Sequence, residues 1–200
     1  MEGKKYLLGL TKINGLGPIK LKKIIEGFAS LEEAWQAGPP ELIARGFSES
    51  EADKIITEKS SINPDQELEQ LTKEQIEIID YKEIGYPKLL KEIYDPPPLL
   101  FFRGKIDALN NNCLAVIGAR KHSDYGRRAI EKIIPTLAQN KITIVSGLAL
   151  GIDAVAHQTT IDAGGLTVGV LGSDLLWNNI GPKNNFQLAK SIIDTGGCLI

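Results

Sequence analysis

The carboxy-terminal half of the sequence alternates short apolar runs with amphipathic segments, and this alternation constrains the fold more than any other feature. Three runs rich in β-branched residues each lead into a loop that contains glycine: 114–117, 143–145 and 167–171. Helical periodicity fills three further segments: 123–139, 152–163 and about 185–194. This order predicts a doubly wound α/β fold, in which buried parallel strands are covered on both faces by right-handed crossovers.

The first 62 residues carry a different pattern, of short helices separated by turns. Residues 19–27 place apolar side chains on one face, and Ser30 with Glu33 and Ser48 with Glu51 each have the spacing of a capping box. We therefore expect three segments: a helical domain over 1–62, a connecting segment with a short strand and a proline-rich crossing over 63–98, and the α/β domain over 99–200. Residues 197–200 read as the opening of a further strand. We expect the α/β domain to be incomplete and the chain to be a piece of a longer protein.

Cysteine and histidine are scarce, which excludes several classes of site. Cys113 and Cys198 lie far apart, and His122 and His157 are the only two histidines, so neither a disulfide framework nor a zinc site is predicted. No apolar run approaches the roughly 20 residues of a membrane span, and residues 1–10 lack the features of a signal peptide. We expect a cytoplasmic protein that has no cofactor and does not contact a membrane.

The near-neutral net charge of −2 hides local patches of both signs. Residues 1–25 carry six basic side chains and one acidic, whereas residues 26–80 carry four basic and fourteen acidic. Residues 101–132 are basic again, with seven lysines or arginines against three acids. Two basic patches on an acidic chain indicate specific contacts with anions, although an ordinary solvated surface explains the charges equally well.

Three loops follow the predicted strands, where ligands of α/β sheets bind. Residues 118–123 begin with glycine and include Arg120, whose guanidinium suits phosphate. Residues 146–153 place two glycines four apart around a strand-to-helix turn, which leaves backbone amides for an anion. Residues 172–185 bring Lys183 and Asn185 to a helix start, where the asparagine is either a phosphate contact or a cap.

Asp153 and His157 lie four residues apart on one helical face and resemble the orienting half of a hydrolytic relay. No nucleophile accompanies them, because Ser146 lacks the flanking glycines of a nucleophile elbow. We expect both side chains to brace the loops and expect no catalytic residue. The Gly-x-Gly-x-x-Gly and P-loop patterns are also missing, so neither dinucleotide binding nor P-loop hydrolysis is predicted.

The helical domain contains a glycine hairpin followed by lysines. Two glycines let such a helix-hairpin-helix present amides to a nucleic-acid phosphate, while lysines supply charge. The candidate DNA contacts are Gly15, Gly17, Lys20, Lys22 and Lys23. A turn that only packs two helices remains the alternative. Aromatic residues that either stack on bases or fill the core are Phe101, Phe102, Tyr125, Trp177 and Phe186.

Several of these motifs together resemble one known family. Residues 95–104 read Asp-Pro-Pro-Pro-Leu-Leu-Phe-Phe-Arg-Gly, residues 116–120 read Val-Ile-Gly-Ala-Arg, and residues 146–153 read Ser-Gly-Leu-Ala-Leu-Gly-Ile-Asp, followed by Ala156 and His157. These stretches are similar to the DNA-processing protein A (DprA, also called Smf) family. Tyr86–Pro87 and the hairpin at 15–17 look like the family's amino-terminal sterile-alpha-motif-like (SAM-like) domain.

The resemblance implies a Rossmann-like domain that binds single-stranded DNA and is not an enzyme. Family members protect incoming single strands during natural transformation and help to load the RecA recombinase, usually as homodimers. On this resemblance and the loop pattern together, the expected phosphate-contacting residues are Gly118, Ala119, Arg120, Ser146, Gly147, Gly151, Lys183 and Asn185.

Three positions depart from the family pattern. Ala119 stands where serine is usual, Gly181 where tyrosine is usual, and Leu166 where many members have arginine or lysine. Each loss is expected to cost about 1 kcal/mol or more of DNA affinity.

Two alternatives remain open. A nucleotide-binding enzyme of the phosphoribohydrolase type would use the same crevice, but its Pro-Gly-Gly-x-Gly-Thr-x-x-Glu loop does not occur here. The helical domain could instead bind protein, with DNA contact confined to the α/β domain, and the acidic run 26–80 favours this mildly.

Overall fold

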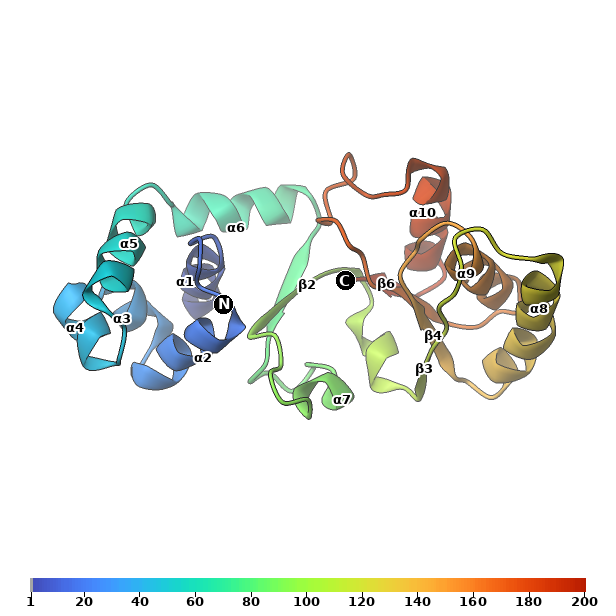
Figure 1. Cartoon of the computed structure of the whole chain (residues 1–200), viewed down its shortest axis with the longest axis horizontal. Coiled ribbons are helices and arrows are strands. Elements are labelled where there is room, and N and C mark those ends of the chain that lie inside the picture. Colours follow the sequence, from blue (N-terminus) through green and yellow to red (C-terminus); the bar gives the residue numbers. More distant parts are fainter. Residues whose placement is uncertain (1) are drawn as a thin grey trace. The chain divides into compact units, whose positions relative to one another are not determined.

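A computed structural model describes residues 2–200, which fold into two units (Figure 1). Unit 1 comprises residues 2–75, 80–82 and 93–100, and unit 2 comprises residues 76–79, 83–92 and 101–200. Residues 63–75, which we expected to lie in a connecting segment, belong to unit 1. The reason is that helix α6 (Pro64–Lys73) packs against α1 (Glu2–Thr11).

The helices of unit 1 are short and joined by tight turns. Besides α1 and α6 they are α2 (Pro18–Gly27), α3 (Leu31–Gln36), α4 (Pro39–Ala44) and α5 (Glu49–Lys59). Their core contains the fully buried side chains Leu8, Ile24 and Ala52. Short helices therefore follow one another from Glu2 to Lys59, as the sequence predicts for this segment.

Two serine caps start helices in unit 1, and they differ in detail. Ser48 and Glu51 form the reciprocal box, because the Glu51 carboxylate accepts the Ser48 N–H at 2.8 Å and lowers its own pKa to about 2, chiefly through this backbone hydrogen bond. Ser30 accepts the Glu33 N–H at 3.0 Å, but the Glu33 carboxylate reaches the N–H of Ala29 instead. Glu33 thus pairs with the residue before Ser30, whereas the predicted capping box has it pair with Ser30 itself.

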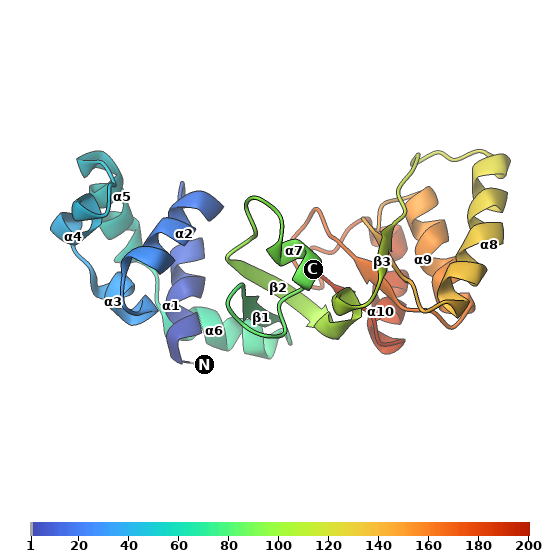
Figure 2. The same ribbon diagram turned by 90° about the horizontal axis from the view of Figure 1, so that it is seen from below.

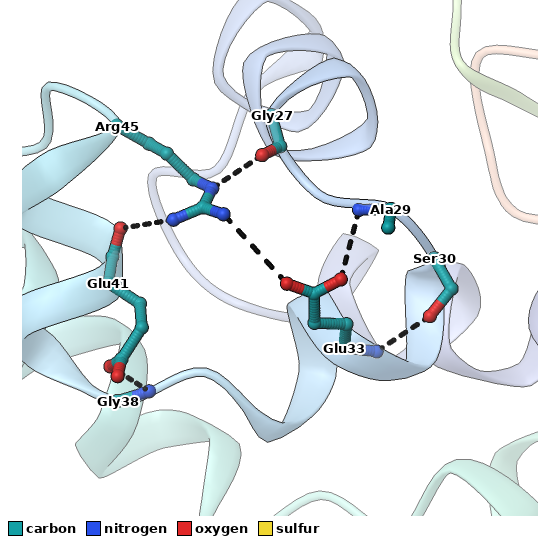
Figure 3. Close-up of polar contacts among 7 residues, drawn as sticks. All are labelled: Gly27, Ala29, Ser30, Glu33, Gly38, Glu41 and Arg45. Atoms are coloured by element: carbon teal, nitrogen blue, oxygen red, sulfur yellow. Dashed lines mark hydrogen bonds and ion pairs between the residues drawn. The ribbon is translucent and has the colours of Figure 1, made fainter.

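Arg45 ties together three helices of unit 1 (Figure 3). Its Nε donates to the carbonyl of Gly27 at the end of α2 at 2.5 Å, and its Nη1 donates to the carbonyl of Glu41 in α4 at 3.1 Å. Its Nη2 lies 3.9 Å from Glu33 Oε1 in α3, and the guanidinium stacks 3.7 Å above the ring of Phe28. One side chain therefore satisfies helix-end carbonyls that would otherwise need water.

In residues 2–200 the strands form one six-stranded sheet with the order β1-β2-β6-β5-β4-β3. Figure 2 labels β1, β2 and β3 of this sheet. The strands are β1 (Glu77–Asp80), β2 (Leu99–Gly104), β3 (Cys113–Ala115), β4 (Thr143–Ser146), β5 (Thr167–Gly169) and β6 (Cys198–Leu199). Strands β3 to β6 pair in parallel, whereas β2 runs antiparallel to β6. The predicted Rossmann-like α/β class is confirmed, with a mixed rather than purely parallel sheet.

The crossover helices of unit 2 are α8 (Asp124–Gln139), α9 (Ile152–Asp162) and α10 (Phe186–Asp194). All three pack against the same face of the sheet, as right-handed crossovers between strands that are neighbours in chain order require. The expectation that crossovers cover both faces is therefore wrong. Ile144 meets α8 and α9 on this face. The other face packs against the 3₁₀ segment Ile106–Asn110 through Ala108, Val168 and Cys198. A short helix, α7 (Lys88–Lys91), and a 3₁₀ turn, Lys183–Asn185, complete the unit.

Strand β3 is less buried than the sequence predicted. The run 114–117 reads as a buried strand, but Leu114 in β3 is 43% exposed, and Ile117, which follows the end of the strand, is 78% exposed. The physical reason is that β3 lies at the end of the strand order and pairs with β4 alone among the described residues.

Candidate nucleic-acid interface

Three loops meet at the carboxyl ends of β3, β4 and β5. The first loop spans residues 116–123, the second 147–151 and the third 170–182. Together they form a pocket of about 360 Å³, which we call the three-loop pocket. Its lining residues are Arg120, Gly147, Ala149, Leu150, Gly172, Ser173, Gly181 and Pro182.

The carboxylate of Asp153 connects the first two loops from inside. This side chain is only 6% exposed; its Oδ1 accepts the N–H of Gly118 at 3.4 Å and its Oδ2 accepts the N–H of Gly147 at 3.1 Å. The amides of Gly118 and Gly147, which we expected to face a phosphate, are therefore already paired within the protein. Asp153 holds the loops together in the way a bound anion would.

Glycine is required where the first loop passes over the start of α9. Gly151 has φ +90°, and a Cβ there would collide with the carbonyl oxygens of Ala119 and Arg120. A Cβ at Gly118 would lie 2.7 Å from Cβ of Ile152. The N–H of Ile152 also donates to the Ala119 carbonyl at 3.2 Å. Gly118, Ala119 and Gly151 thus fix the loop packing rather than line the pocket.

Two polar side chains predicted to contact phosphate are used internally. Ser146 is 3% exposed and its Oγ donates to the carbonyl of Val116 at 2.6 Å. Asn185 is 7% exposed and its Nδ2 donates to the carbonyls of Leu148 and Ala149 at 2.8 and 3.1 Å. Neither side chain faces solvent: Ser146 ties the end of β4 to the first loop, and Asn185 braces the second loop. Their contact with phosphate stays a prediction, and this packing does not favour it.

Arg120 and Lys183 are the exposed cations predicted for this site. Arg120 lines the three-loop pocket and has no ion pair within residues 2–200. Lys183 does not line the pocket; its Nζ donates to the carbonyl of Asn178 in the third loop. The structure therefore assigns the pocket's positive charge to Arg120.

His157 is fully buried on α9, against strand β5. The Thr167 hydroxyl donates to the carbonyl of Ile144 at 2.8 Å and so accepts the Nδ1–H of His157 at 2.7 Å. Burial lowers the pKa of His157 to about 4, which leaves the ring neutral near pH 7. Both oxygens of Asp153 face the loop amides, so the Asp153–His157 relay that the sequence spacing allows is not formed.

Arg103 supports the third loop, a role the sequence analysis did not assign. It is 2% exposed on β2, its Nε donates to the carbonyl of Leu175 at 2.7 Å, and its guanidinium lies 4.7 Å from the ring centre of Trp177. Trp177 in turn packs edge-on against Phe186 at 5.5 Å. A buried arginine beside tryptophan cannot be recognised from a charge count, because the packing joins residues more than 70 positions apart.

The three departures from the family pattern occupy different places. Gly181 lines the three-loop pocket, and Ala119 is exposed in the first loop. Leu166 precedes β5 and packs against Val168 and Cys198. It therefore lies at the amino end of the strand, across the sheet from the pocket, and the expectation that it alters the DNA site is not supported by its position.

The glycine hairpin of unit 1 is largely engaged by unit 1 itself. The N–H of Asn14 donates to the Glu58 carboxylate at 2.6 Å, and Lys20 pairs with Glu51 at 2.9 Å. Lys23 donates to the carbonyl of Gly46 at 2.6 Å. Gly15 has φ +88°, as a tight turn requires, and Gly17 precedes α2 as its N-cap. Lys22 has no hydrogen bond or ion pair in the part of the chain that the structure describes.

Within residues 2–200 no group of three or more histidine, cysteine, aspartate or glutamate side chains is placed to hold a metal ion. Over the same residues, no helix combines the length and apolar character needed to cross a bilayer.

Comparison with known proteins finds a matching family model and relatives named Smf or DprA. A family model described as DNA recombination-mediator protein A matches residues 77–200. Protein Smf of Synechocystis sp. is 36% identical over 196 residues, which cover 96% of this chain and 49% of that protein. The DNA processing protein DprA of Streptococcus pneumoniae is 47% identical over 107 residues, covering 54% of this chain and 37% of that protein. The chain thus spans about half the length of the Synechocystis relative.

Two solved structures of DprA proteins are similar to this chain in fold. The X-ray structure of DprA from Streptococcus pneumoniae matches with a TM-score of 0.76 and 29% identity, over 98% of this chain and 66% of that chain. The Helicobacter pylori DprA, described for its single-stranded DNA binding mode, matches with a TM-score of 0.53 and 28% identity, over 62% of this chain and 55% of that chain.

Proposed function

Because the chain belongs to the DNA recombination-mediator protein A family, also known as DprA or Smf, we propose that its three-loop pocket binds single-stranded DNA. The observation that carries the proposal is the convergence of three loops around one exposed cation, Arg120, with no ion pair in the described residues. A phosphate supplies the negative charge that neutralises the Arg120 guanidinium, and its oxygens accept two parallel hydrogen bonds from that group. The relative from Helicobacter pylori, which is described as binding single-stranded DNA, supports this choice of ligand.

The proposed role is binding without a chemical step. Asp153 is turned inward to the amides of two loops and His157 to the Thr167 hydroxyl of β5, which leaves the pocket with a cation and small or apolar side chains. Such a site suits a ligand that is held rather than transformed. The proposed contact surface consists of Arg120, which positions the phosphates, and of the loop backbone around it. Four small residues shape this backbone: Gly118, Ala119, Gly147 and Gly151.

The wider role is proposed from the family. It comprises DNA processing in the cytoplasm, protection of incoming strands in natural transformation, loading of the RecA recombinase and assembly as a homodimer. Chromatography of the chain with and without RecA, combined with light scattering, measures the two partner claims. Co-elution with RecA and a dimeric mass support them, whereas a monomer that does not retain RecA contradicts them for residues 1–200.

DNA binding itself is tested by fluorescence anisotropy of a labelled oligothymidine titrated with the chain, with duplex of equal length as competitor. Micromolar or tighter binding that duplex fails to displace supports the proposal. Absence of binding at low salt, or equal competition by duplex, contradicts it.

A further inference from the structure

One face of α8 carries an exposed tyrosine and two exposed cations in helical register. Tyr125, Arg128 and Lys132 lie at positions i, i+3 and i+7, so their side chains line one face of the helix. The opposite face holds Ile134 and Ala138, which are buried against the sheet side of unit 2. We call the face formed by Tyr125, Arg128 and Lys132 the α8 track.

The charges of the α8 track are not neutralised by neighbouring acids. Arg127, on an adjacent face, pairs with Glu131 at 2.7 Å. Asp124 lies one helical turn before Arg128 but forms no ion pair with it in the described residues. Arg128 and Lys132 make no ion pair within the described residues 2–200. The track therefore presents two cations to solvent, where a ligand with two negative charges would complement them.

Tyr125 differs from the other aromatic residues of unit 2 that the sequence suggested for stacking. Phe102 is 6% exposed, and Trp177 and Phe186 pack against each other and against Lys190. Tyr125 is 77% exposed and has no ring contact or hydrogen bond in the described part of the chain. Its ring is free to stack on a planar group.

The α8 track begins where the first loop ends. Arg120, which lines the three-loop pocket, is five positions before Tyr125, and Ser123 caps the helix by accepting the N–H of Gly126 at 3.2 Å. A Cβ at Gly126 would lie 3.4 Å from Cδ1 of Ile152, so the first turns of α8 and α9 adjoin. A chain of phosphates leaving Arg120 can therefore continue along the helix.

We propose that the α8 track extends the nucleic-acid path beyond the three-loop pocket, with Tyr125 stacking on an unpaired base and Arg128 and Lys132 contacting the flanking phosphates. The inference rests on the proposed binding of single-stranded DNA. An unpaired strand fits better than a duplex, because only an unstacked base offers its face to the tyrosine ring. Cations beside an exposed aromatic are also the arrangement that binds single strands without sequence preference.

The test compares two labelled oligonucleotides with the same number of phosphates, an oligothymidine and an abasic analogue. Tyr125→Ala raises the Kd for oligothymidine at least about fivefold, since one lost stacking contact is worth about 1 kcal/mol or more, and leaves the Kd for the abasic strand unchanged. Tyr125→Phe keeps wild-type affinity, because the ring alone is needed. Tyr94→Ala, at a tyrosine of unit 1 that is 99% exposed, is the matched control and changes neither Kd.

The cations are tested with the double variant Arg128→Gln and Lys132→Gln. It weakens binding of both oligonucleotides and lowers the slope of log K against log salt by about 1.4, which corresponds to two phosphate contacts on a single strand. Unchanged oligothymidine binding by Tyr125→Ala overturns the stacking proposal, as does an equal loss on the abasic strand. If the wild-type chain binds neither oligonucleotide, the proposed function itself fails. Normal wild-type binding that no α8 variant alters refutes the track alone.

Discussion

The carboxylate of Asp153 accepts the backbone N–H of Gly147 at 3.1 Å, and its other oxygen accepts the N–H of Gly118. The first turn of α9 thereby holds two loops that belong to different strands. Because the carboxylate is buried and both oxygens are used, the pocket's geometry depends on a negative charge that never contacts the ligand. The only cation that lines the pocket among the described residues, Arg120, is then left for an external anion.

Asp153→Ala is expected to lower the free energy of unfolding by about 2 kcal/mol, since it leaves two backbone donors without an acceptor. It also weakens oligothymidine binding, because the first and second loops lose their link. Urea denaturation and anisotropy measure the two effects. Asp162→Ala on the same helix is the control: its carboxylate is exposed and accepts only from Gln158, so stability changes by no more than about 0.5 kcal/mol. Equal behaviour of the two variants would contradict the bracing role.

The buried His157 makes stability depend on pH. Its pKa is about 4 in the folded chain, lowered by burial, against 6.5 for an ordinary histidine, so the unfolded chain binds the proton first as pH falls. Stability contributed by the neutral ring is complete above pH 6.5 and is lost as pH falls toward 4. Between pH 7.5 and pH 5 this group accounts for a loss of about 2 kcal/mol.

Urea denaturation of wild type, His157→Gln and His122→Gln at these two pH values checks the assignment. The His157 variant loses this part of the pH dependence, whereas the His122 variant keeps it. A wild-type slope that survives His157→Gln would assign the dependence to other groups.

Arg103→Met is expected to loosen the third loop. It removes the donor to the Leu175 carbonyl and the cation over Trp177, at a cost of about 2 kcal/mol for the unsatisfied buried carbonyl and lost contact. Arg103→Lys does not restore stability, because an ammonium cannot both lie flat on the indole and donate in the guanidinium geometry. Thermal denaturation and the tryptophan emission of Trp177 report the change. Wild-type stability in both variants would show that the third loop keeps its conformation without Arg103.

The hairpin of unit 1 is expected to contribute little to DNA affinity, because Glu51 and Glu58 already engage its lysine and amide. Lys20→Ala therefore changes the Kd for oligothymidine by less than about twofold, within the range of a neutral surface substitution. Lys22→Ala tests the one hairpin lysine without a described partner. A loss of tenfold or more in either variant would restore the hairpin as a DNA contact and weaken the alternative that unit 1 binds protein.

The sequence predicted most helices and the parallel strands because their signals are local. The helical periodicity over 123–139 locates α8, at 124–139, nearly to the residue. Helix α4 was not predicted; it begins at Pro39 and Pro40, since proline is favourable in the first turn of a helix. Strand β2 was missed because its partner, β6, lies almost 100 residues later and runs antiparallel.

In the candidate site, too, local features were predicted from the sequence and features that depend on tertiary packing were not. The loops were predicted correctly in position, since glycine after a strand marks where backbone turns into the crevice. The inward direction of Ser146 and Asn185 depends on the carbonyls of Val116 and Leu148, which only tertiary packing brings near. The free aromatic ring of Tyr125 is likewise a matter of burial, which spacing alone does not distinguish from a core position.

The most direct test of the account is the salt dependence of oligothymidine binding by wild type and Arg120→Ala, with Lys73→Ala as the control at an exposed lysine of unit 1 paired with Glu69. The account predicts that Arg120→Ala binds every oligonucleotide more weakly and that its slope of log K against log salt is smaller by about 0.7, the value for one phosphate contact on a single strand. The control keeps the wild-type slope. An Arg120→Ala variant with wild-type affinity and slope would contradict the assignment of the three-loop pocket as the DNA site.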